Sequence, residues 1–509
     1  MLTETPVDFG EYTPDLPPLK NPNATVISGA FPRTDRSYGP IATPAVYSGA
    51  LSARCQGAFA ARSKAGSVSV FAGDATKLYR LDTDATLDDV SKVGGYTISS
   101  DEHWCFAQFK ERALACNISD AIQTWTLDSS SVFADLSGSA PKARYMAAVS
   151  PGFLLTGNVA DGSDSYPNRV WWPAINDVTS WPTPGSSSAA AAQSGYNDLA
   201  YGGWIRGITG PVGGANGSVF CDYAIHRVEY VGTPDVFAFR EVVRGRGLPA
   251  PQSLVTVTLP NGTVVAAFLA DDGFYIFDGG GLTPIGNQRV DKTFYTDVDQ
   301  TYLYRVYGVV DPLNKLVWWY YPNSSASAGN PNRALIWNYV TNRWAYVEDS
   351  SIACEMPVTL FTTGYTLDGL DTLGMALEDF TISFDSRVWL GGKFLFGMFN
   401  ADHELAFLTG AAMAATLETG EFDGGGGRRL YCGGIRPLCD GGTLTTQVGY
   451  RNTPQESLTY TTATSVEASG ACPQHVDARY MRARMSIAAG GTWTHAMGVG
   501  ALVRPSGGR

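Results

Sequence analysis

The residue types that could carry chemistry are sparse in this chain. Its five histidines are not spaced as His-x-His or His-x-x-x-His, the patterns that bring two imidazoles to one metal ion. They are His103, His226, His403, His475 and His495. Neither a Gly-x-Ser-x-Gly elbow nor a Gly-x-x-x-x-Gly-Lys-[Ser/Thr] phosphate loop occurs. The sequence therefore predicts no catalytic residue, no cofactor-binding residue and no metal ligand, and we expect a protein that is not an enzyme.

Three aspartates are the strongest candidates for acid–base chemistry. Paired carboxylates hydrolyse glycosides, and Asp271, Asp272 and Asp278 stand close together in the sequence. Each precedes a glycine or lies beside one in a tight turn, where aspartate accepts hydrogen bonds from the local backbone. The chain also lacks the Ser-x-Asp-x-Gly-x-Thr-Trp repeat of sialidase-like enzymes. We interpret all three as turn residues.

Two other stretches suggest ligand binding. Gly424–Gly427 precedes Arg428 and Arg429 and could cradle an anion, but no helix start follows, so a flexible turn is the favoured interpretation. Trp171-Trp172 and Trp318-Trp319-Tyr320-Tyr321 could stack sugars. Consecutive aromatics on a strand face opposite sides of the sheet, which favours filling two separate cores.

The composition describes a turn-rich, aromatic-rich β protein. The 509 residues include 57 Gly, 25 Tyr, 23 Phe and 12 Trp, and only 17% are charged. The net charge of −12 argues against a protein that grips nucleic acid through a basic surface. Residues 413–509 differ from the rest, since they hold nine arginines, seven carboxylates and no lysine. This shift predicts a domain boundary near residue 412.

The cysteines and the N-terminus indicate the cellular setting. None of the eight cysteines forms a Cys-x-x-Cys motif, so we favour buried free thiols, although Cys432 and Cys439 could face each other across a hairpin. The start of the chain lacks a basic segment followed by an apolar one, and no stretch approaches the ~20 apolar residues of a membrane span. We expect synthesis in the cytoplasm and no membrane-spanning segment.

Repeated strand–turn units provide the main architectural signal. Units of about four short strands recur every 40–50 residues from about Gln56 to about Leu408, as in β-propellers, whose blades must stack to bury both faces. The unit with strands at Val255–Leu259, Val264–Ala270 and Phe274–Phe277 is the clearest. We predict a ring of six or seven four-stranded blades; a pair of β-sandwiches or a solenoid would produce similar local strands. The last unit would use Ser383–Leu390, Phe394–Phe399 and Leu405–Leu408.

Three segments of different character result. Residues 1–34 contain five prolines before position 23 and predict an extended arm, ordered only by what it lies on. Residues 35–412 form the all-β propeller-like domain. Residues 413–509 show apolar–polar alternation, as in Met481–Ile487, and predict a separate antiparallel β-sandwich. Gly185–Gly195 is interpreted as a mobile loop, with a short helix as the alternative.

Several phrases together resemble one family, the tail hub or nozzle proteins of short-tailed bacteriophages, also described as packaged-DNA stabilisation proteins. They are GDATKLYRLD (73–82), HWCFAQFKERALACN (103–117), PNRVWWPAINDVTSWP (167–182), FLADDGFYIFDGGGLTPIG (268–286), VVDPLNKLVWWYYP (309–322) and ATLETGEF (415–422). The C-terminal phrases GRRLYCGGIRPLCDGG (427–442) and GTWTHAMGVGALVRP (491–505) are similar to such proteins as well.

The resemblance implies a structural component of the virion tail. Proteins of this family assemble as a homo-oligomeric ring, usually a hexamer, below the portal and the head–tail adaptor, and tail fibres or needle and tip proteins attach to such tails. The ring extends the channel for duplex DNA, closes it until ejection and retains the packaged genome. The family has no catalytic residues to carry over. The acidic balance fits a lumen through which DNA slides without tight binding, because each phosphate neutralised by Lys or Arg would add affinity.

Two expectations and two alternatives complete this interpretation. We expect the C-terminal arginines to contact carboxylates of a neighbouring subunit; they include Arg428, Arg429, Arg436, Arg482 and Arg484. The segments 185–195 and Pro322–Pro331 are the candidate gating loops. The alternatives are a glycan-binding or glycan-cleaving propeller, such as a tail spike, and a cellular ligand-binding propeller.

Overall fold

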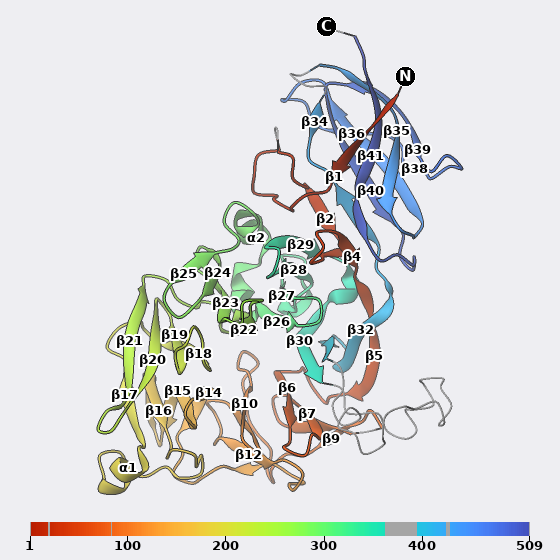
Figure 1. Cartoon of the computed structure of the whole chain (residues 1–509). Coiled ribbons are helices and arrows are strands. Elements are labelled where there is room, and N and C mark those ends of the chain that lie inside the picture. Colours follow the sequence, from red (N-terminus) through yellow and green to blue (C-terminus); the bar gives the residue numbers. More distant parts are fainter. Residues whose placement is uncertain (1, 19–20, 83, 362–393, 424–427, 508–509) are drawn as a thin grey trace.

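A computed structural model describes residues 2–18, 21–82, 84–361, 394–423 and 428–507 (Figure 1). Over these residues the chain is almost entirely β. Seven sets of four antiparallel strands stand around a common centre and form a β-propeller; six are separate sheets and the seventh is part of a larger sheet. The expected all-β, propeller-like fold is therefore confirmed, with seven blades among the described residues. The strands of blades one to six follow one another along the sequence.

The strands of blades one to three are β6 (Gly57–Arg62), β7 (Val68–Gly73), β8 (Leu78–Leu81), β9 (Leu87–Asp89), β10 (Cys105–Phe109), β11 (Arg112–Cys116), β12 (Gln123–Thr126), β13 (Ala134–Asp135), β14 (Lys142–Val149), β15 (Phe153–Asp161), β16 (Asp164–Trp172) and β17 (Gly195–Asp198). Those of blades four to six are β18 (Ile205–Thr209), β19 (Gly217–Cys221), β20 (Ala224–Gly232), β21 (Val236–Arg244), β22 (Val255–Thr258), β23 (Val264–Ala270), β24 (Gly273–Phe277), β25 (Leu282–Pro284), β26 (Tyr307–Asp311), β27 (Leu316–Tyr321), β28 (Arg333–Asn338) and β29 (Arg343–Val347). The first strand of each blade contacts the first strands of its neighbours at most positions around the ring, so these strands surround the axis.

Blade seven closes the ring with a strand from the beginning of the propeller. Its order is β30 (Cys354–Phe361), β31 (Phe394–Asn400), β32 (Glu404–Ala412) and then β5 (Ala42–Ala50). The register pairs Leu408 with Pro44. The sequence analysis did not assign β30 to this blade, and its predicted strand Ser383–Leu390 lies outside the described residues.

Consecutive aromatics fill the cores on both sides of a blade, as expected. In β16, Trp171 packs in the core between blades two and three, and Trp172 packs in the core between blades three and four. In β27, the ring of Trp318 lies 4.9 Å from that of Phe396 in blade seven. The neighbouring Trp319 lies 4.7 Å from Phe274 in blade five. Alternating side-chain direction along a strand explains both pairs.

The C-terminal residues form a β-sandwich that also uses the N-terminus. One sheet contains β1 (Thr3–Asp8), β3 (Ala30–Pro32), β4 (Tyr38–Pro40), β35 (Leu430–Cys439), β39 (Cys472–Ala478) and β41 (Ala496–Pro505). The other contains β33 (Ala415–Glu418), β34 (Phe422–Asp423), β36 (Leu444–Arg451), β37 (Thr459–Tyr460), β38 (Thr464–Ser465) and β40 (Tyr480–Ile487). The predicted arm is therefore partly sandwich strands, and residues 38–40 belong to the sandwich and not to the propeller.

One short strand joins the two domains into a single sheet. β2 (Val26–Ser28) pairs with β29 of blade six in parallel and with β33 of the sandwich in antiparallel fashion. An 11-stranded sheet thus runs from β26 to β37. The sequence predicted a separate sandwich packed against the propeller, and this prediction is wrong. The two domains share a sheet, because the backbone groups on the two edges of β2 form hydrogen bonds with a strand of each domain.

Helices are short and few among the described residues. α1 (Ser187–Ala192) lies within the segment 185–195, so the helical alternative holds there, and Ser186 caps it by accepting from the Ala189 amide. α2 (Asp291–Asp297) precedes blade six. Short 3₁₀ segments occur at η1 (Pro251–Ser253), η2 (Gln300–Arg305), η3 (Ser327–Gly329) and η4 (Ser350–Ile352). None of the helices in the described ranges is long and apolar enough to span a membrane.

Candidate functional sites at the propeller axis and the domain junction

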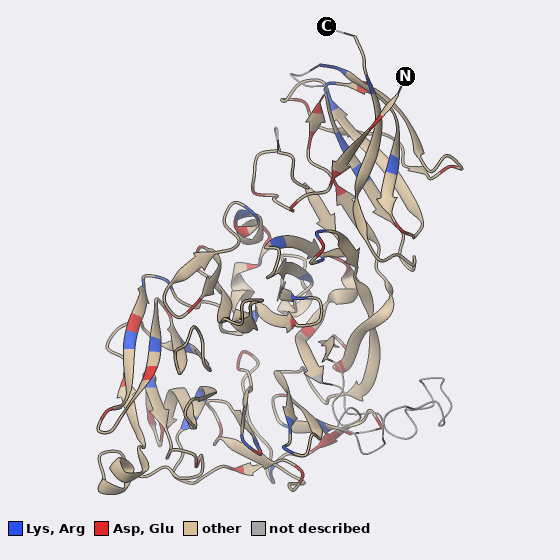
Figure 2. Ribbon diagram, viewed as in Figure 1, with Lys and Arg blue, Asp and Glu red and all other residues tan. Residues whose placement is uncertain are grey.

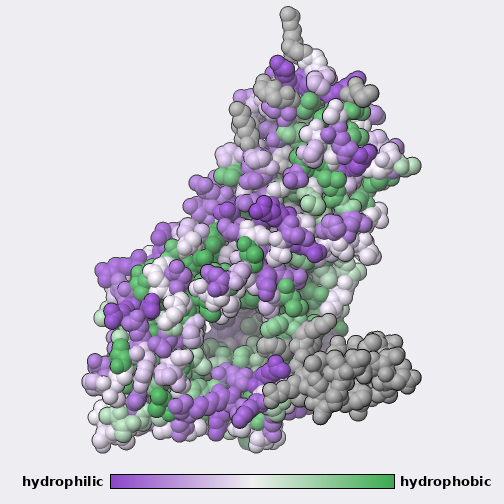
Figure 3. Space-filling model, viewed as in Figure 1, coloured by the Kyte–Doolittle hydropathy of each residue, from purple (hydrophilic) through white to green (hydrophobic). Residues whose placement is uncertain are grey.

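A five-residue segment before β10, Ser99–His103, lies across one mouth of the propeller axis; we call it the axial segment. Two side chains that precede blade one hold this segment by donating hydrogen bonds to its backbone carbonyls. Gln56, which precedes blade one, donates to the carbonyls of Ser99 and Glu102, both at 2.7 Å. Arg54 donates to the carbonyl of Ser100 at 2.8 Å. Figure 3 shows a recess in the middle of the ring on the face in view.

Side chains of the axial segment reach two further blades. Asp101 accepts a hydrogen bond of 2.8 Å from the hydroxyl of Tyr304, a residue that lies just before blade six in the sequence. Glu102 forms an ion pair of 2.9 Å with Arg144 of blade three. Because blades one, three and six stand around the axis, bonds to all three place the segment across the centre of the ring. The propeller's own channel is therefore obstructed at this mouth.

His103 completes this arrangement as a neutral group. Its Nε2 lies 2.8 Å from the Tyr307 hydroxyl, which also accepts from Arg54 at 2.9 Å. Burial, together with the positive charges of Arg54 and Arg305, lowers the pKa of His103 to about 3. Burial raises the pKa of Tyr307 to about 12. Both groups therefore stay uncharged near neutral pH, and the hydrogen bond between them is structural and not part of an acid–base pair.

A cavity of about 170 Å³ lies beside the axial segment. Its lining includes Asp101, Glu102, Arg144, Arg206 and Cys105. Arg206 is engaged with Asp222 at 2.5 Å, so each of the two lining cations already has an acidic partner.

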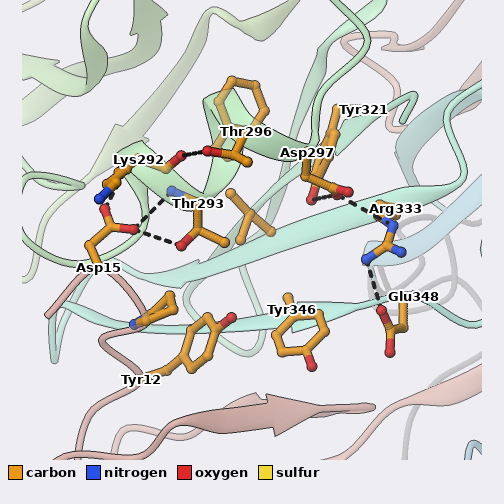
Figure 4. Close-up of a pocket in the computed structure, with 13 residues that line it drawn as sticks. Tyr12, Asp15, Lys292, Thr293, Thr296, Asp297, Tyr321, Arg333, Tyr346 and Glu348 are labelled. Carbon is orange, nitrogen blue, oxygen red and sulfur yellow. Dashed lines mark hydrogen bonds and ion pairs between the residues drawn. The ribbon is translucent and has the colours of Figure 1, made fainter. Parts of the chain in front are cut away.

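A second, larger pocket of about 440 Å³ lies where the N-terminal residues cross blade six (Figure 4). Asp15 supplies the cap that α2 lacks locally, since its carboxylate accepts from the amides of Lys292 and Thr293, both at 2.8 Å. Beside it, the rings of Tyr12 and Tyr346 lie 5.2 Å apart. Burial raises the pKa of Tyr12 well above its usual value, helped by Tyr346 and Asp15.

The opposite wall of this junction pocket is a chain of charged groups. Asp297 accepts from the Tyr321 hydroxyl at 2.9 Å and lies 3.3 Å from Arg333. Arg333 donates in turn to Glu348 at 2.8 Å. Figure 4 shows these groups around the rim of the pocket. Every carboxylate named here is bound to a cation, a hydroxyl or a helix amide, so the pocket ties the N-terminal residues to blade six and presents no free acid–base pair among its described groups.

A buried ionic cluster holds the sandwich at the same junction. Glu418 is 1% exposed and lies 2.7 Å from Arg484 and 3.4 Å from Arg482. It also accepts from the hydroxyls of Thr25 and Tyr460, both at 2.8 Å. Thr25, which directly precedes β2, therefore binds the same carboxylate as the sandwich arginines.

Four of the C-terminal arginines expected to contact a neighbouring subunit have carboxylate partners within the same chain. Arg482 and Arg484 bind Glu418, Arg429 binds Asp477 at 2.8 Å, and Arg436 binds Glu4. Arg451, which the sequence did not single out, binds Glu421 at 2.6 Å. The count of charges could not show that the carboxylates lie on facing strands of the same chain. Arg428 remains exposed, and Gly424–Gly427 lies outside the described residues.

The three aspartates are turn residues, as interpreted. Asp278 accepts from the amides of Gly280 and Gly281. Asp272 binds Arg246 at 2.8 Å, and its pKa is lowered by that arginine and by Tyr275 against the effect of burial. Burial and the charge of Asp272 raise the pKa of Asp271.

Asp291 is the carboxyl that sequence reasoning missed. Burial raises its pKa to about 7, and its carboxyl packs against the backbone of Gly273 and Gly286 while accepting from the Phe274 amide at 3.1 Å. The two glycines leave room for the carboxyl. Their spacing in the sequence was the only available signal, and it did not reveal which side chain would occupy the space.

The remaining candidates have structural partners. All eight cysteines carry free thiols, so Cys432 and Cys439 are not paired. His403 lies 2.8 Å from Glu355. In the loop 322–331, Asn323 bonds the amide of Ser325 and the side chain of Asn332. Among the residues that the structure describes, no three His, Cys, Asp or Glu side chains gather as a metal site.

The comparisons with known proteins add little. No family model and no curated protein matches this chain. Among solved structures, it is similar to a chain of the "Crystal Structure of Mitotic Checkpoint Complex", with 9% sequence identity, a TM-score of 0.37, and coverage of 72% of this chain and 92% of that one. A likeness of this size carries no argument, so the propeller assignment rests on the seven sets of four strands themselves.

Proposed function

We propose that this protein is a structural subunit of a short bacteriophage tail, a hub or nozzle ring that extends and closes the DNA channel. The observation that carries the proposal is the set of ordered phrases resembling that family. They run from residue 73 to residue 505 and include strands of blades one, two, three, five and six and of the sandwich. The resemblance therefore spans both domains that β2 joins.

The architecture suits a load-bearing ring subunit. The single sheet from β26 to β37 couples the propeller to the sandwich, and Asp15 and Thr25 add contacts at the same junction. Groups that might have served chemistry are engaged in internal contacts. A non-enzymatic role, with the chain in the virion tail after synthesis in the host cytoplasm, agrees with these features.

In this proposal the DNA channel is formed between copies of the chain. The axial segment obstructs the propeller's own channel, so a duplex would pass along a face of each subunit in a ring, with six copies expected. Figure 2 shows acidic and basic residues spread over the blades and not gathered by sign. On blade four, for example, Glu229 lies between Arg227 and Arg240. Such a surface suits passage of DNA without tight binding.

Electron microscopy of the purified protein, alone and with the portal and adaptor proteins, tests the assembly. Closed rings, usually sixfold, that bind an adaptor-bearing particle are expected; a monomer that never binds such a particle would contradict the proposal. Titration with linear duplex DNA at several salt concentrations tests the lumen. A binder making 6–10 phosphate contacts would lose roughly 10³–10⁵ in affinity between low and moderate salt, whereas we expect weak binding with a shallow slope.

One observation favours the alternative of a glycan-binding propeller such as a tail spike. Trp204 and Tyr223 are 52% and 45% exposed, and they flank the Arg206–Asp222 pair. Exposed aromatic rings beside planar charged groups suit the apolar face and hydroxyls of a sugar. Binding of surface polysaccharide that Trp204→Ala abolishes, or its hydrolysis by the isolated protein, would favour this alternative over the ring.

A further inference from the structure

Two cysteines face each other directly across the first hairpin of blade two. Cys105 at the start of β10 pairs in register with Cys116 at the end of β11. We propose that this pair is a site of covalent oxidation, at which a peroxide joins the two sulfurs in a disulfide that crosses the hairpin. The proposal is independent of the proposed function, although a protein of the virion would meet oxidants after leaving its host.

The backbone geometry of the hairpin permits the bond. Phe109 and Arg112 flank a two-residue turn, and Lys110 within it has a φ of 52°, as tight hairpins require. Directly opposed residues in antiparallel strands have Cα atoms about 4.5–5.5 Å apart and point their side chains to the same face. Disulfides span Cα separations of about 4.4–6.8 Å. The separation expected for a directly opposed pair therefore lies within the range that a disulfide spans.

The two thiols have unequal roles. The neighbouring Cys116 side chain, with a further contribution from the backbone of Met146, lowers the pKa of Cys105. The Met146 amide lies 3.4 Å from that sulfur. Burial raises the pKa of Cys116 well above its usual value. Cys105 is thus the better source of a thiolate, the form that attacks an oxidant.

Access differs in the same direction. Cys105 is half-buried and lines the cavity of about 170 Å³ beside the axial segment, whereas Cys116 is 0% exposed. A cavity of this size corresponds to on the order of five or six water molecules at ~30 Å³ each, which is enough for hydrogen peroxide. The oxidant therefore meets Cys105 first.

The reaction balances in two steps. The Cys105 thiolate attacks one oxygen of hydrogen peroxide, the O–O bond breaks, and the departing hydroxide takes a proton to become water, leaving a sulfenic acid on Cys105. The Cys116 sulfur then attacks the Cys105 sulfur, the S–O bond breaks, and the hydroxide takes the Cys116 proton. Two thiols and one peroxide yield one disulfide and two waters.

The other cysteines in strands lack this arrangement. Cys221 lies opposite Ile205, Cys354 opposite Asn400, and Cys439 opposite Ala496. Cys472 lies opposite Ile435, and Cys432 lies opposite Val476 and Val503. We therefore expect oxidation to be selective for the Cys105–Cys116 pair.

Peptide mapping of the full-length protein tests the proposal. The protein is treated with a small excess of hydrogen peroxide, blocked with N-ethylmaleimide under denaturing conditions and digested with trypsin without reductant. Trypsin cleaves after Lys110 and Arg112, so a disulfide would connect two peptides that otherwise separate. We expect a linked pair that reductant splits, with Cys221 still blocked by maleimide as the internal control.

A variant isolates the first step. In Cys116→Ala the sulfenic acid on Cys105 has no partner, and dimedone should trap it; in Cys105→Ala no dimedone adduct should form at Cys116. If the folded wild-type protein shows no linked pair, or if Cys221 is oxidised as readily as Cys105, the proposal is wrong. Should Cys116→Ala not fold, binding of phenylarsine oxide to the wild-type protein replaces it: the arsenical must bridge Cys105 and Cys116, and its failure to protect both from maleimide would likewise overturn the proposal.

Discussion

The propeller and the domain junction are held together by opposite kinds of contact. Between blades, aromatic side chains such as Trp319 and Phe274 pack without charge, whereas at the junction Glu418 and two arginines are buried together. Apolar packing is gained in many small, non-directional contacts, but a buried ion cluster stabilises only when every member is present. A large loss of stability in the propeller should therefore require removal of a whole buried side chain, whereas at the junction the loss of a single charge should be enough.

The largest effect is expected at the centre of the apolar region. Trp319 is 0% exposed, stacks near Trp344 at 5.6 Å and donates to the Ser253 carbonyl at 3.0 Å. Trp319→Ala should lower the free energy of unfolding by about 3–5 kcal/mol, because it leaves a cavity. Urea denaturation followed by tryptophan fluorescence measures this change. Trp204→Ala, at a 52% exposed site, is the matched control and should leave stability nearly unchanged.

Removing one charge from the junction should have an effect of nearly the same size. Glu418→Gln keeps the volume of the side chain but leaves Arg484 without its anion and leaves Arg482 only the more distant Glu421, at 3.9 Å. We expect a cost of about 3 kcal/mol or more. Differential scanning calorimetry of the full-length protein measures it. The control is Glu4→Gln, whose partner Arg436 is 40% exposed, for which about 0–1 kcal/mol is expected. Equal losses in both variants would show that burial of the Glu418 cluster does not add to its contribution to stability.

A glycine tests whether β2 couples the domains. Gly29 follows β2 with a φ of 71°, and a Cβ there would collide with the Ala414 carbonyl oxygen. Gly29→Ala should cost about 1–3 kcal/mol through strain and should loosen the shared sheet. We expect one calorimetric transition in the wild-type protein and two in the variant. Gly49→Ala, where a Cβ meets no neighbour within 4 Å, is the control and should keep a single transition.

The smallest expected effect is a dependence of the protein's stability on pH, caused by Asp291 of α2, which precedes blade six of the propeller. The pKa of Asp291 is raised by burial to about 7, so between about pH 4 and pH 7 the folded chain holds a proton that the unfolded chain has released. Stability should fall as the pH rises through this window. Asp291→Asn should flatten that slope in melting temperatures measured from pH 4 to pH 8. An unchanged slope would show that Asp291 is not its source.

Local features of the propeller were predictable from the sequence. The strand Val264–Ala270 was predicted with the bounds of β23, since turn residues mark both ends and apolar residues fill the stretch. The opposite directions of Trp171 and Trp172 follow from strand geometry alone. Such features depend on neighbours in the sequence, where propensity and periodicity act.

Features that join distant residues were not predictable in the same way. β5 pairs with β32 and β2 pairs with β33, and in each case some 350 residues or more separate the partners. The ion partners of Arg482 and Arg484 depend on which strands face each other, and the residue that fills the space at Gly273 and Gly286 depends on the path of the chain before α2. The composition shows how many charged groups the chain contains, but only the strand topology determines which of them lie next to each other.

The strands near the N-terminus have a consequence for how the protein is made. β1 pairs with β41, β2 with β33 and β5 with β32, so these early strands leave the ribosome long before their partners. The backbone N–H and C=O groups of these strands stay unpaired during synthesis, and unpaired strand edges can associate with other chains. Ring closure and docking of the sandwich then occur late and nearly together. A nascent chain of this protein should depend on chaperones until β41, the partner of β1, has been released.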